Sequence, residues 1–456
     1  MQQLRTSQIT IIGGGLTGLT LAFYLKRAGK KVTIIERNHE PGGVIRTFTE
    51  QGFTYEAGPN TGVLSSPELV QLFDDLGDTC NLEVANPNAK RRLILKDGSW
   101  EALPHNLSSA ITTPLFSLYD KIRILGEPFR KKGSNPYETL DKLVARRLGK
   151  SFLDYAVDPF ISGIYAGNPA NLVTKFALPK LYNLEQNYGS FIRGAIKKRQ
   201  EPKSELEQRA TKDVFSVKNG LQQLTQALTA AIGHENFILN AKRTSVTLQN
   251  GKCQTTVSTE ENDILVESEE LITTIGAYEL ANTLTFLTPE DLSPITNMRY
   301  AKVAQVALGY KEWNGYPLNG FGGLIPSKEN RKVLGILFPS SIFPNRAPEK
   351  GALLSVFLGG IQHEDIYNLP DQELIDTALN EVSETLKTNL KPDMIHLFRY
   401  PYAIAQYERS SEQRLDQIAL LEQQYKGLYL AGNIRNGIGM ADRVKQGVTI
   451  ANMLIK

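Results

Sequence analysis

The glycine-rich segment Gly13–Gly18 has the spacing of a turn that binds the pyrophosphate of a dinucleotide. Its first glycine permits the bend, Gly15 lets the pyrophosphate approach the backbone, and Gly18 allows helix and strand to pack closely. The apolar run Ile9–Ile12 precedes the turn and an amphipathic stretch ending at Gly29 follows it, so the predicted order is strand, turn, helix. The N-terminus of that helix presents free N–H groups to the phosphates. The residues predicted to contact the cofactor here are Gly13, Gly14, Gly15, Leu16, Thr17 and Gly18.

Glu36 follows a second apolar run, Val32–Ile35, and stands eighteen residues after Gly18 (36 − 18). A carboxylate at this distance can accept hydrogen bonds from both ribose hydroxyls of an adenosine, and it repels a 2′-phosphate. Strand, glycine turn, helix and acid together therefore predict a site for a dinucleotide that carries no 2′-phosphate.

Two loops in the N-terminal region favour a flavin dinucleotide over NAD. Pro41–Thr47 is a second glycine loop, which NAD-dependent dehydrogenases do not usually carry, and its Arg46 is placed to meet a phosphate or a flavin carbonyl. In Glu56–Thr61 a glycine and a proline fix the backbone, so that main-chain groups can face a ring system. The residues assigned to the cofactor in this region are Arg37, Gly42, Gly43, Val44, Arg46, Gly58, Pro59, Asn60 and Thr61.

The C-terminal segment Gly427–Asn433 again reads as a strand followed by glycine, and a helical pattern comes after it. The N-terminus of that helix would stabilise the negative charge that develops at the N1/C2=O edge of a reduced isoalloxazine. Both ends of the chain are thus predicted to build one FAD-binding domain, with other segments inserted between them. The terminal loop contains no cysteine, so we expect non-covalent FAD. The residues assigned here are Gly432, Asn433, Ile438, Gly439 and Met440.

Composition excludes several other classes of protein. The 456 residues are too many for one ordinary domain, and a net charge of +3 is too small to indicate a nucleic-acid-binding protein. No run of 18 apolar residues exists to span a bilayer. Cys80 and Cys253 form no CxxC and the five histidines show no zinc-binding spacing, so we expect no metal site. The first strand begins close to Met1, which predicts a cytoplasmic protein without a leader segment.

The predicted fold class is α/β, with an FAD-binding Rossmann-type domain of three layers, an inserted mixed-sheet substrate domain and a helical domain. Strand patterns at Lys302–Tyr310, Val333–Phe338 and Leu353–Leu358 indicate the inserted sheet, and Asn250-Gly251 predicts a hairpin with a type I′ turn. We assign residues 1–95, 211–275 and 406–456 to the FAD-binding domain, 96–210 to the helical domain and 276–405 to the substrate-binding domain.

The stretch Leu107–Lys132 mixes apolar residues with lysines and arginines. Such a stretch can pack within its domain or lie on a membrane interface. We interpret it as packed within the helical domain, with peripheral membrane association as the alternative.

Several motifs occur together in a known family. The glycine turn, Gly42–Thr47 and Leu430–Asn433 are found throughout the FAD-dependent amine oxidase superfamily. Through four narrower motifs the chain resembles, nearly end to end, the protoporphyrinogen oxidase family. The resemblance implies an oxidase of heme biosynthesis that takes six hydrogens from protoporphyrinogen IX, with FAD as hydride acceptor, O₂ as terminal oxidant and hydrogen peroxide as by-product. The narrower motifs are Arg92–Gly98, Asp158–Pro169, Gly320–Glu329 and Ser340–Pro348.

The same resemblance implies which residues bind the substrate. Arg92 matches the arginine that holds a propionate of the tetrapyrrole, although Arg91 beside it could do the same. Leu324 and Phe343 match apolar residues that sandwich pyrrole rings, and core packing is the other interpretation of Phe343. Gly163 matches a glycine whose backbone lies close to the substrate.

Some positions depart from the family pattern, and some alternatives stay open. Arg243 stands where a valine usually touches the adenosine, which is tolerable if only its main chain is used. The sequence offers no clear catalytic acid–base pair, and it leaves the oligomeric state open. Coproporphyrinogen III is the alternative substrate. A flavin-bearing porphyrin-binding protein without turnover and an amine oxidase are the alternative functions.

Overall fold

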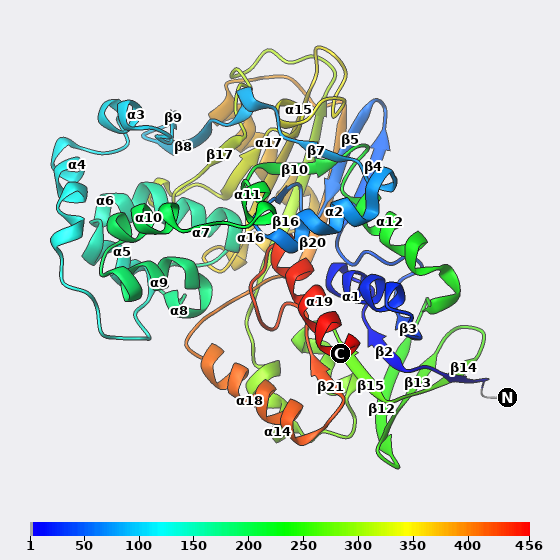
Figure 1. Ribbon diagram of the computed structural model, residues 1–456. Coiled ribbons are helices and arrows are strands. Elements are labelled where there is room, and N and C mark those ends of the chain that lie inside the picture. The colour runs from blue at the N-terminus through cyan, green and yellow to red at the C-terminus, as the bar shows by residue number, and fades with distance from the viewer. Residues whose placement is uncertain (1–2) are drawn as a thin grey trace.

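The computed structural model describes residues 3–456, and a parallel sheet lies at the centre of its cofactor-binding part (Figure 1). Apolar runs form its strands because both faces of the sheet are covered. Ile11 and Ile34 pack on the helical side, and Ile12 and Ile35 pack on the opposite side. The strand order is β11 (Phe237–Ile238), β3 (Val32–Ile35), β2 (Ile9–Ile12), β15 (Glu270–Thr273) and β21 (Leu428–Leu430).

Helices cover one face of this sheet and a second sheet covers the other, which confirms the predicted three-layer domain. The Asn250-Gly251 hairpin forms as predicted, with both residues at positive φ, because a type I′ turn requires that conformation. The covering sheet comprises β1 (Gln3–Thr6), β14 (Asp263–Ser268), β13 (Lys252–Ser258) and β12 (Arg243–Gln249). The helices are α1 (Leu16–Arg27), α2 (Pro67–Leu76), α12 (Gln222–Ile232) and α19 (Met440–Ile455).

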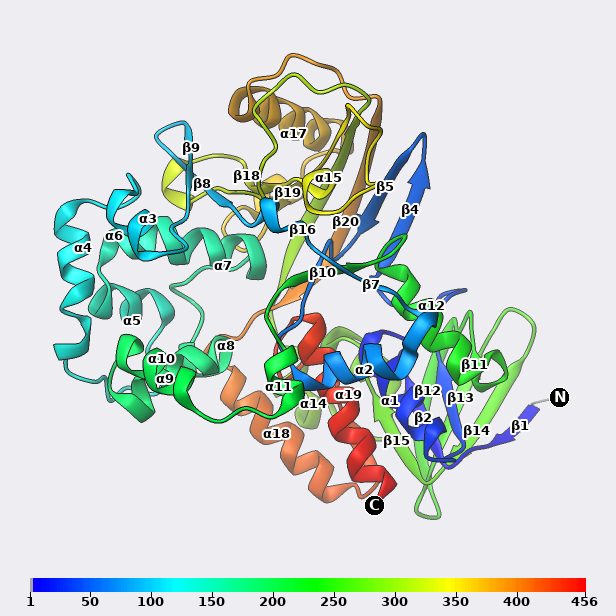
Figure 2. The same cartoon turned by 45° about the horizontal axis from the view of Figure 1, so that its top comes forward.

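A seven-stranded mixed sheet forms the inserted domain, and α17 (Asp371–Leu386) packs on one of its faces (Figure 2). All three strands predicted for it are present. Residues 92–102 also join this sheet because β8 pairs with β17, although the sequence-based division placed them in the FAD-binding and helical segments. The order is β20 (Met394–Ala405), β16 (Tyr300–Tyr310), β19 (Ala352–Gly359), β18 (Val333–Leu337), β17 (Gly322–Leu324), β8 (Arg92–Lys96) and β9 (Ser99–Ala102).

The helical part lies at one side of the inserted sheet (Figure 1). A buried ion cluster holds it together, in which the guanidinium of Arg147 contacts the carboxylates of Glu127 and Glu185. Among residues 3–456, no helix is both long enough and apolar enough to cross a membrane. The helices are α3 (Leu107–Thr112), α4 (Leu118–Leu125), α5 (Leu140–Arg147), α6 (Lys150–Phe152), α7 (Asp158–Tyr165), α8 (Thr174–Ala177), α9 (Pro179–Tyr188), α10 (Phe191–Gln200) and α11 (Glu205–Arg209), with a π-helical turn at Leu153–Val157.

The remaining elements connect these parts. A hairpin leads from the cofactor sheet toward β16, and a small sheet lies between the cofactor and substrate parts. The hairpin is β4 (Arg46–Glu50) and β5 (Phe53–Ala57), and the small sheet is β6 (Gly62–Val63), β10 (Val214–Val217) and β7 (Leu82–Val84). The other helices are α13 (Leu280–Thr283), α14 (Pro289–Thr296), α15 (Pro339–Ile342), α16 (Glu364–Tyr367) and α18 (Ser411–Gln424).

Candidate active site

The glycine turn joins β2 to α1, as the sequence predicts. Gly13 has a φ of +108°, and a Cβ on Gly18 would lie 2.1 Å from the carbonyl oxygen of Gly13. No other residue type fits either position without strain. Among residues 3–456, no side chain caps the N-terminus of α1, so its first N–H groups remain available to a ligand.

Open space lies in front of this helix. A Cβ on Gly15 would meet no atom within 4 Å, and a Cβ on Gly43 would meet only the Cα of Gly15, at 3.3 Å. The loop at Gly43 thus lies next to the first glycine turn. Gly42 in this loop donates its N–H to the carbonyl oxygen of Gly14. This cradle beside unpaired helix N–H groups fits the pyrophosphate of a dinucleotide.

Glu36 lies at the end of β3 and is only 5% exposed. Its Oε2 accepts the N–H of Gly14 at 2.8 Å, and its Oε1 accepts the backbone and side-chain N–H groups of Asn38 at 2.9 Å. The carboxylate therefore fixes the glycine turn, and its contact with a ribose stays a prediction. The N–H of Ala241 bonds to the carbonyl of Glu36, which brings the main chain of Arg243 to this end of the sheet while its side chain is exposed.

The two arginines predicted to meet the cofactor both pair with carboxylates. Arg46 contacts Glu40 at 2.6 Å, and Arg37 contacts Glu279 at 3.2 Å. Val44, within the second glycine loop, is exposed. The charges of both arginines are thus partly compensated within the protein, and their contact with FAD stays a prediction.

The loop from Gly58 to Thr61 is fixed by buried polar residues that the sequence analysis missed. Gln305, at the centre of β16, donates to the carbonyl of Glu56 at 2.7 Å and accepts the N–H of Gly58 at 3.2 Å. Ser355 on β19 donates to Oδ1 of Asn60 at 2.8 Å. The signal available in the sequence was a polar residue within each of two apolar strand patterns, because buried polar side chains need hydrogen-bond partners. The sequence does not show which of these residues face this loop.

The C-terminal loop lies beside the glycine turn at Thr274, which follows β15. The Thr274 hydroxyl donates to the oxygen of Gly13 at 2.9 Å, and a Cβ on Gly432 would lie 2.7 Å from the oxygen of Thr274. Tyr300 donates to Oδ1 of Asn433 at 3.1 Å. The two cofactor segments therefore meet at the carboxyl ends of parallel strands, where ligands of such sheets bind. Of the predicted residues, Met440 begins α19, Gly439 is its N-cap and Ile438 precedes it, and α19 packs directly on α1 (Figures 1 and 2).

Gly163 and Leu324 are brought together where the helical part meets the mixed sheet. A Cβ on Gly163 would lie 2.3 Å from Cδ2 of Leu324, so a larger residue there would displace the leucine side chain. Arg92 is exposed at the start of β8 and lies over the ring of Phe321. Phe343, in contrast, is 2% exposed, and the guanidinium of Arg346 lies over its ring. The role of Phe343 against a pyrrole ring stays a prediction.

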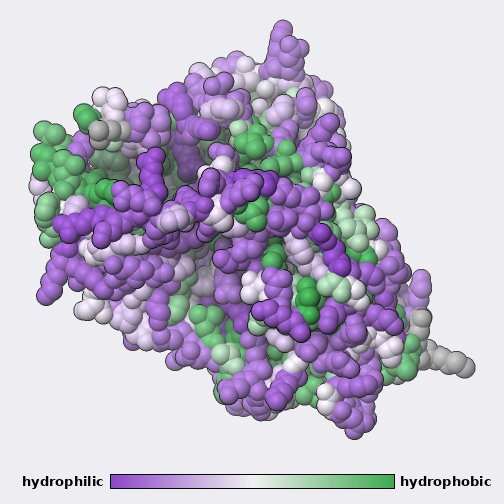
Figure 3. Space-filling view, in the orientation of Figure 1, coloured by the Kyte–Doolittle hydropathy of each residue, from purple (hydrophilic) through white to green (hydrophobic). Residues whose placement is uncertain are grey.

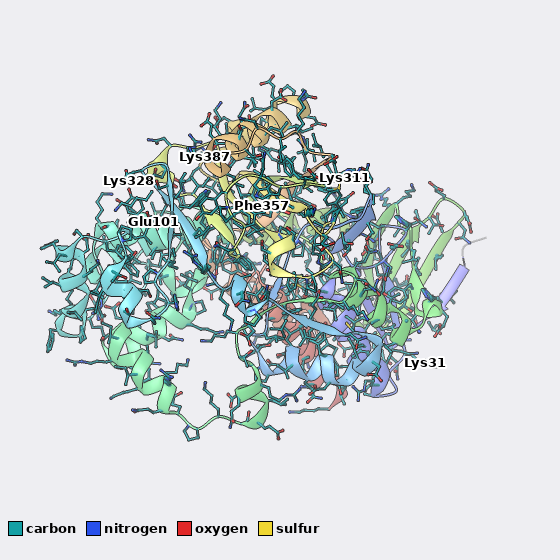
Figure 4. All side chains as sticks on the ribbon, turned by 90° about the horizontal axis from the view of Figure 1, so that it is seen from above. Lys31, Glu101, Lys311, Lys328, Phe357 and Lys387 are labelled. Atoms are coloured by element: carbon teal, nitrogen blue, oxygen red, sulfur yellow. The ribbon has the colours of Figure 1, made fainter. Side chains whose placement is uncertain are left out.

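Tyr155 belongs to the apolar cluster beside Leu324 and carries two cations near its ring. The ammonium groups of Lys96 and Lys328 lie 5.0 and 5.1 Å from its centroid, and Lys328 is seen at the edge of the molecule in Figure 4. Its hydroxyl donates to Glu329 at 3.3 Å. Burial raises the pKa of Tyr155 to about 12, so the phenol is protonated at neutral pH.

The carboxylates nearest this contact are engaged in structural hydrogen bonds. Asp158 on α7 accepts the N–H of Ser327 at 2.7 Å and its hydroxyl at 2.9 Å, and burial raises the pKa of Asp158. No group of three or more His, Cys, Asp and Glu side chains that could hold a metal ion occurs in the described chain, residues 3–456.

Comparison with known proteins agrees with this geometry. The model of the flavin containing amine oxidoreductase family matches residues 16–455. Protoporphyrinogen oxidase 2, chloroplastic/mitochondrial, of Arabidopsis thaliana is 28% identical, over 98% of this chain and 94% of that protein. Coproporphyrinogen III oxidase of Bacillus subtilis is 27% identical, over 96% of each. A crystal structure from Exiguobacterium sp. 255-15, provisionally assigned as a protoporphyrinogen oxidase, has the same fold, with a TM-score of 0.81 and 21% identity over 99% of each chain.

Proposed function

Because the chain belongs to the flavin containing amine oxidoreductase family, we propose that it is an FAD-dependent oxidase of protoporphyrinogen IX in heme biosynthesis. Six hydrogens leave the substrate in three two-electron steps, and three O₂ become three H₂O₂. The observation that carries this proposal is similarity along nearly the whole chain to oxidases of porphyrinogens. The cradle between Gly15 and Gly43 supports FAD as the particular flavin.

When bound, the flavin accepts the hydride of each step. The residues of this chain bind and orient the cofactor and the substrate. Gly13–Gly18 and the start of α19 would hold the dinucleotide, and Glu36 would hold its ribose. Gln305 and Ser355 fix the loop at Asn60 from beneath. Catalysis then depends on placing the substrate over the flavin, because the nearby carboxylates are committed to structural hydrogen bonds.

Gly163 and Leu324 would form the apolar floor on which the tetrapyrrole lies, with Phe343 as a further apolar contact. Arg92 at the open end of β8 would bind a propionate, since a guanidinium matches a carboxylate with two parallel hydrogen bonds. Coproporphyrinogen III, which carries two further propionates, is the alternative substrate, and a relative that acts on it supports keeping it.

Oxygen uptake with both porphyrinogens side by side is the test of the proposed function. We expect O₂ consumption and fluorescent porphyrin with protoporphyrinogen IX, at a higher kcat/KM than with coproporphyrinogen III. Substrate added without oxygen should bleach the oxidised flavin absorbance. Binding without bleaching would indicate a porphyrin-binding protein instead, and preference for the coproporphyrinogen would reassign the substrate.

Replacement of Arg92 tests the propionate contact. Since Arg92 is exposed, we expect Arg92→Ala to cost about 1–2 kcal/mol of substrate binding, roughly a tenfold rise in KM, with flavin content unchanged. Arg92→Lys should restore only part of the affinity because a point charge lacks the two-pronged geometry. Steady-state kinetics at equal flavin occupancy gives the answer, with Arg91→Ala as the matched control. An effect confined to Arg91→Ala would move the assignment by one residue.

We propose further that the protein associates peripherally with membranes through α4. The expectation that Leu107–Lys132 packs inside the domain is correct for Leu115 and Phe116, which are buried, and wrong for Leu118 and Ile122 of α4, which are exposed, while Ile124 is half-buried. Within the described residues 3–456, α4 has no buried residue, and Leu118 is 74% exposed. This helix forms an apolar patch in Figure 3. The exposed apolar residues here are Ile111, Leu118, Tyr119, Ile122, Leu125 and Phe129.

Vesicle binding checks this proposal. Leu118→Asp together with Ile122→Asp should lower the partition coefficient onto anionic phospholipid vesicles at least tenfold, because burying each side chain contributes about 1.5–3 kcal/mol. Leu420→Asp, at an exposed leucine on α18, is the matched control and should change nothing. Equal flotation of all variants with the vesicles would contradict a role for α4.

A further inference from the structure

The backbone carbonyls of Gly432–Gly437 all accept hydrogen bonds from side chains. Arg443, in the first turn of α19, donates to the carbonyls of Gly432, Arg435, Asn436 and Gly437, the last three at 2.9, 3.0 and 2.9 Å. Arg414 on α18 donates to the carbonyl of Ile434 at 2.9 Å, and Tyr407 donates to that of Asn433 at 3.3 Å. Such complete engagement fixes the orientation of every peptide in the loop.

The N–H groups of the same peptides therefore point the other way. In a planar trans peptide the N–H is directed opposite to the carbonyl. Within residues 3–456, the N–H groups of residues 433–436 have no hydrogen-bond acceptor, whereas that of Gly437 bonds to the hydroxyl of Tyr407 at 3.0 Å. Successive unpaired N–H groups beside a helix N-terminus form a concave site for negative charge.

Among the described residues, neither arginine forms an ion pair with a carboxylate, although the charge of Asp442 acts on Arg443 and that of Glu408 acts on Arg414. In the described chain neither Arg443 nor Arg414 has a carboxylate oxygen within 4.0 Å of its guanidinium, whereas Arg435 in the same loop contacts Glu422 at 2.7 Å. A cation in the first turn of a helix opposes the helix dipole. Burial lowers the pKa of Arg443 and of Arg414, yet guanidinium groups stay charged at neutral pH. Arg443 is therefore kept in an electrostatically unfavourable position by its hydrogen bonds to the loop carbonyls, which indicates a functional role.

We propose that Arg443, assisted by Arg414, is a positioning residue that turns the N–H groups of residues 433–436 toward the flavin and raises the reduction potential of the flavin. The inference rests on the proposed FAD-dependent function. Reduced flavin carries negative charge at its N1/C2=O edge, so a nearby cation that forms no ion pair favours the reduced form.

The test compares Arg443→Met with wild type in two measurements that do not depend on turnover. Titration of apoprotein with FAD gives the Kd, and equilibrium reduction against a dye of known potential gives the flavin midpoint potential. We expect the Kd of Arg443→Met to rise roughly tenfold, equivalent to about 1.4 kcal/mol, and the potential to become more negative. Arg443→Lys should keep a potential close to that of wild type because lysine retains the positive charge. It should bind FAD several-fold more weakly because an ammonium lacks the planar set of donors of a guanidinium.

Lys445→Met is the matched control, since Lys445 is an exposed cation of the same helix, contacts Glu68 at 3.7 Å and, in the described chain, holds no carbonyl of the loop. It should leave the potential unchanged. An unchanged potential in folded, FAD-loaded Arg443→Met would overturn the inference, as would an equal shift in Lys445→Met. If Arg443→Met does not fold, Arg443→Lys decides, and a wild-type Kd in that variant counts against the inference. Absence of FAD binding by wild type would overturn the proposed function and this inference together.

Discussion

Gly15→Val is expected to give a folded protein that carries no FAD. The protein itself has room for the side chain, because a Cβ at Gly15 meets no atom within 4 Å and the backbone there has a φ of −76°. The space that valine would fill is the space through which a pyrophosphate reaches the backbone. The purified variant should lack the visible absorbance of oxidised flavin, and added FAD should not quench the fluorescence of the protein.

Two glycine substitutions serve as controls for this result. Gly15→Ala places one carbon in the same space and should retain weakened FAD binding. Gly18→Ala should instead destabilise the apoprotein, because its Cβ would clash with the oxygen of Gly13 at 2.1 Å, within the protein itself. Thermal unfolding of the three apoproteins separates the two effects. A yellow, fully loaded Gly15→Val protein would show that the dinucleotide does not pass this point.

Glu36→Ala is expected to weaken FAD binding by about 2–4 kcal/mol, since it removes two hydrogen bonds to a charged acceptor. It should also lower the free energy of unfolding of the apoprotein by roughly 1–3 kcal/mol, because the buried N–H of Gly14 loses its acceptor. FAD titration and thermal unfolding of apoprotein measure the two losses separately.

Glu36→Gln and Glu261→Ala complete this comparison. The glutamine keeps one acceptor oxygen and should show an intermediate loss of both affinity and stability. Glu261 is exposed on the turn before β14, so its replacement should change neither quantity. Unchanged FAD affinity in Glu36→Ala would place the ribose elsewhere, while a loss of stability alone would leave Glu36 only its role in the glycine turn.

The exposure of α4 is a feature that the sequence did not predict. The apolar residues of α4 have the spacing of a packed helix face, and the sequence analysis interpreted them as packed. Whether a neighbour covers such a face depends on elements far away in the chain, which local periodicity does not report. The interpretation therefore failed for Leu118 and Ile122, which are exposed, while it succeeded for the adjacent Leu115 and Phe116.

The sequence by itself determined the β2–Gly13–Gly18–α1 unit, the acid at Glu36 and the hairpin at Asn250-Gly251, because glycine conformation and apolar periodicity act over contiguous residues. Only the tertiary structure placed Gln305 beneath the loop at Gly58 and joined β8 to β17. It alone turned the carbonyls of Gly432–Gly437 onto Arg443 and Arg414. These contacts link segments that are far apart in the chain or residues with no periodic spacing, so packing decides them and no local pattern records them.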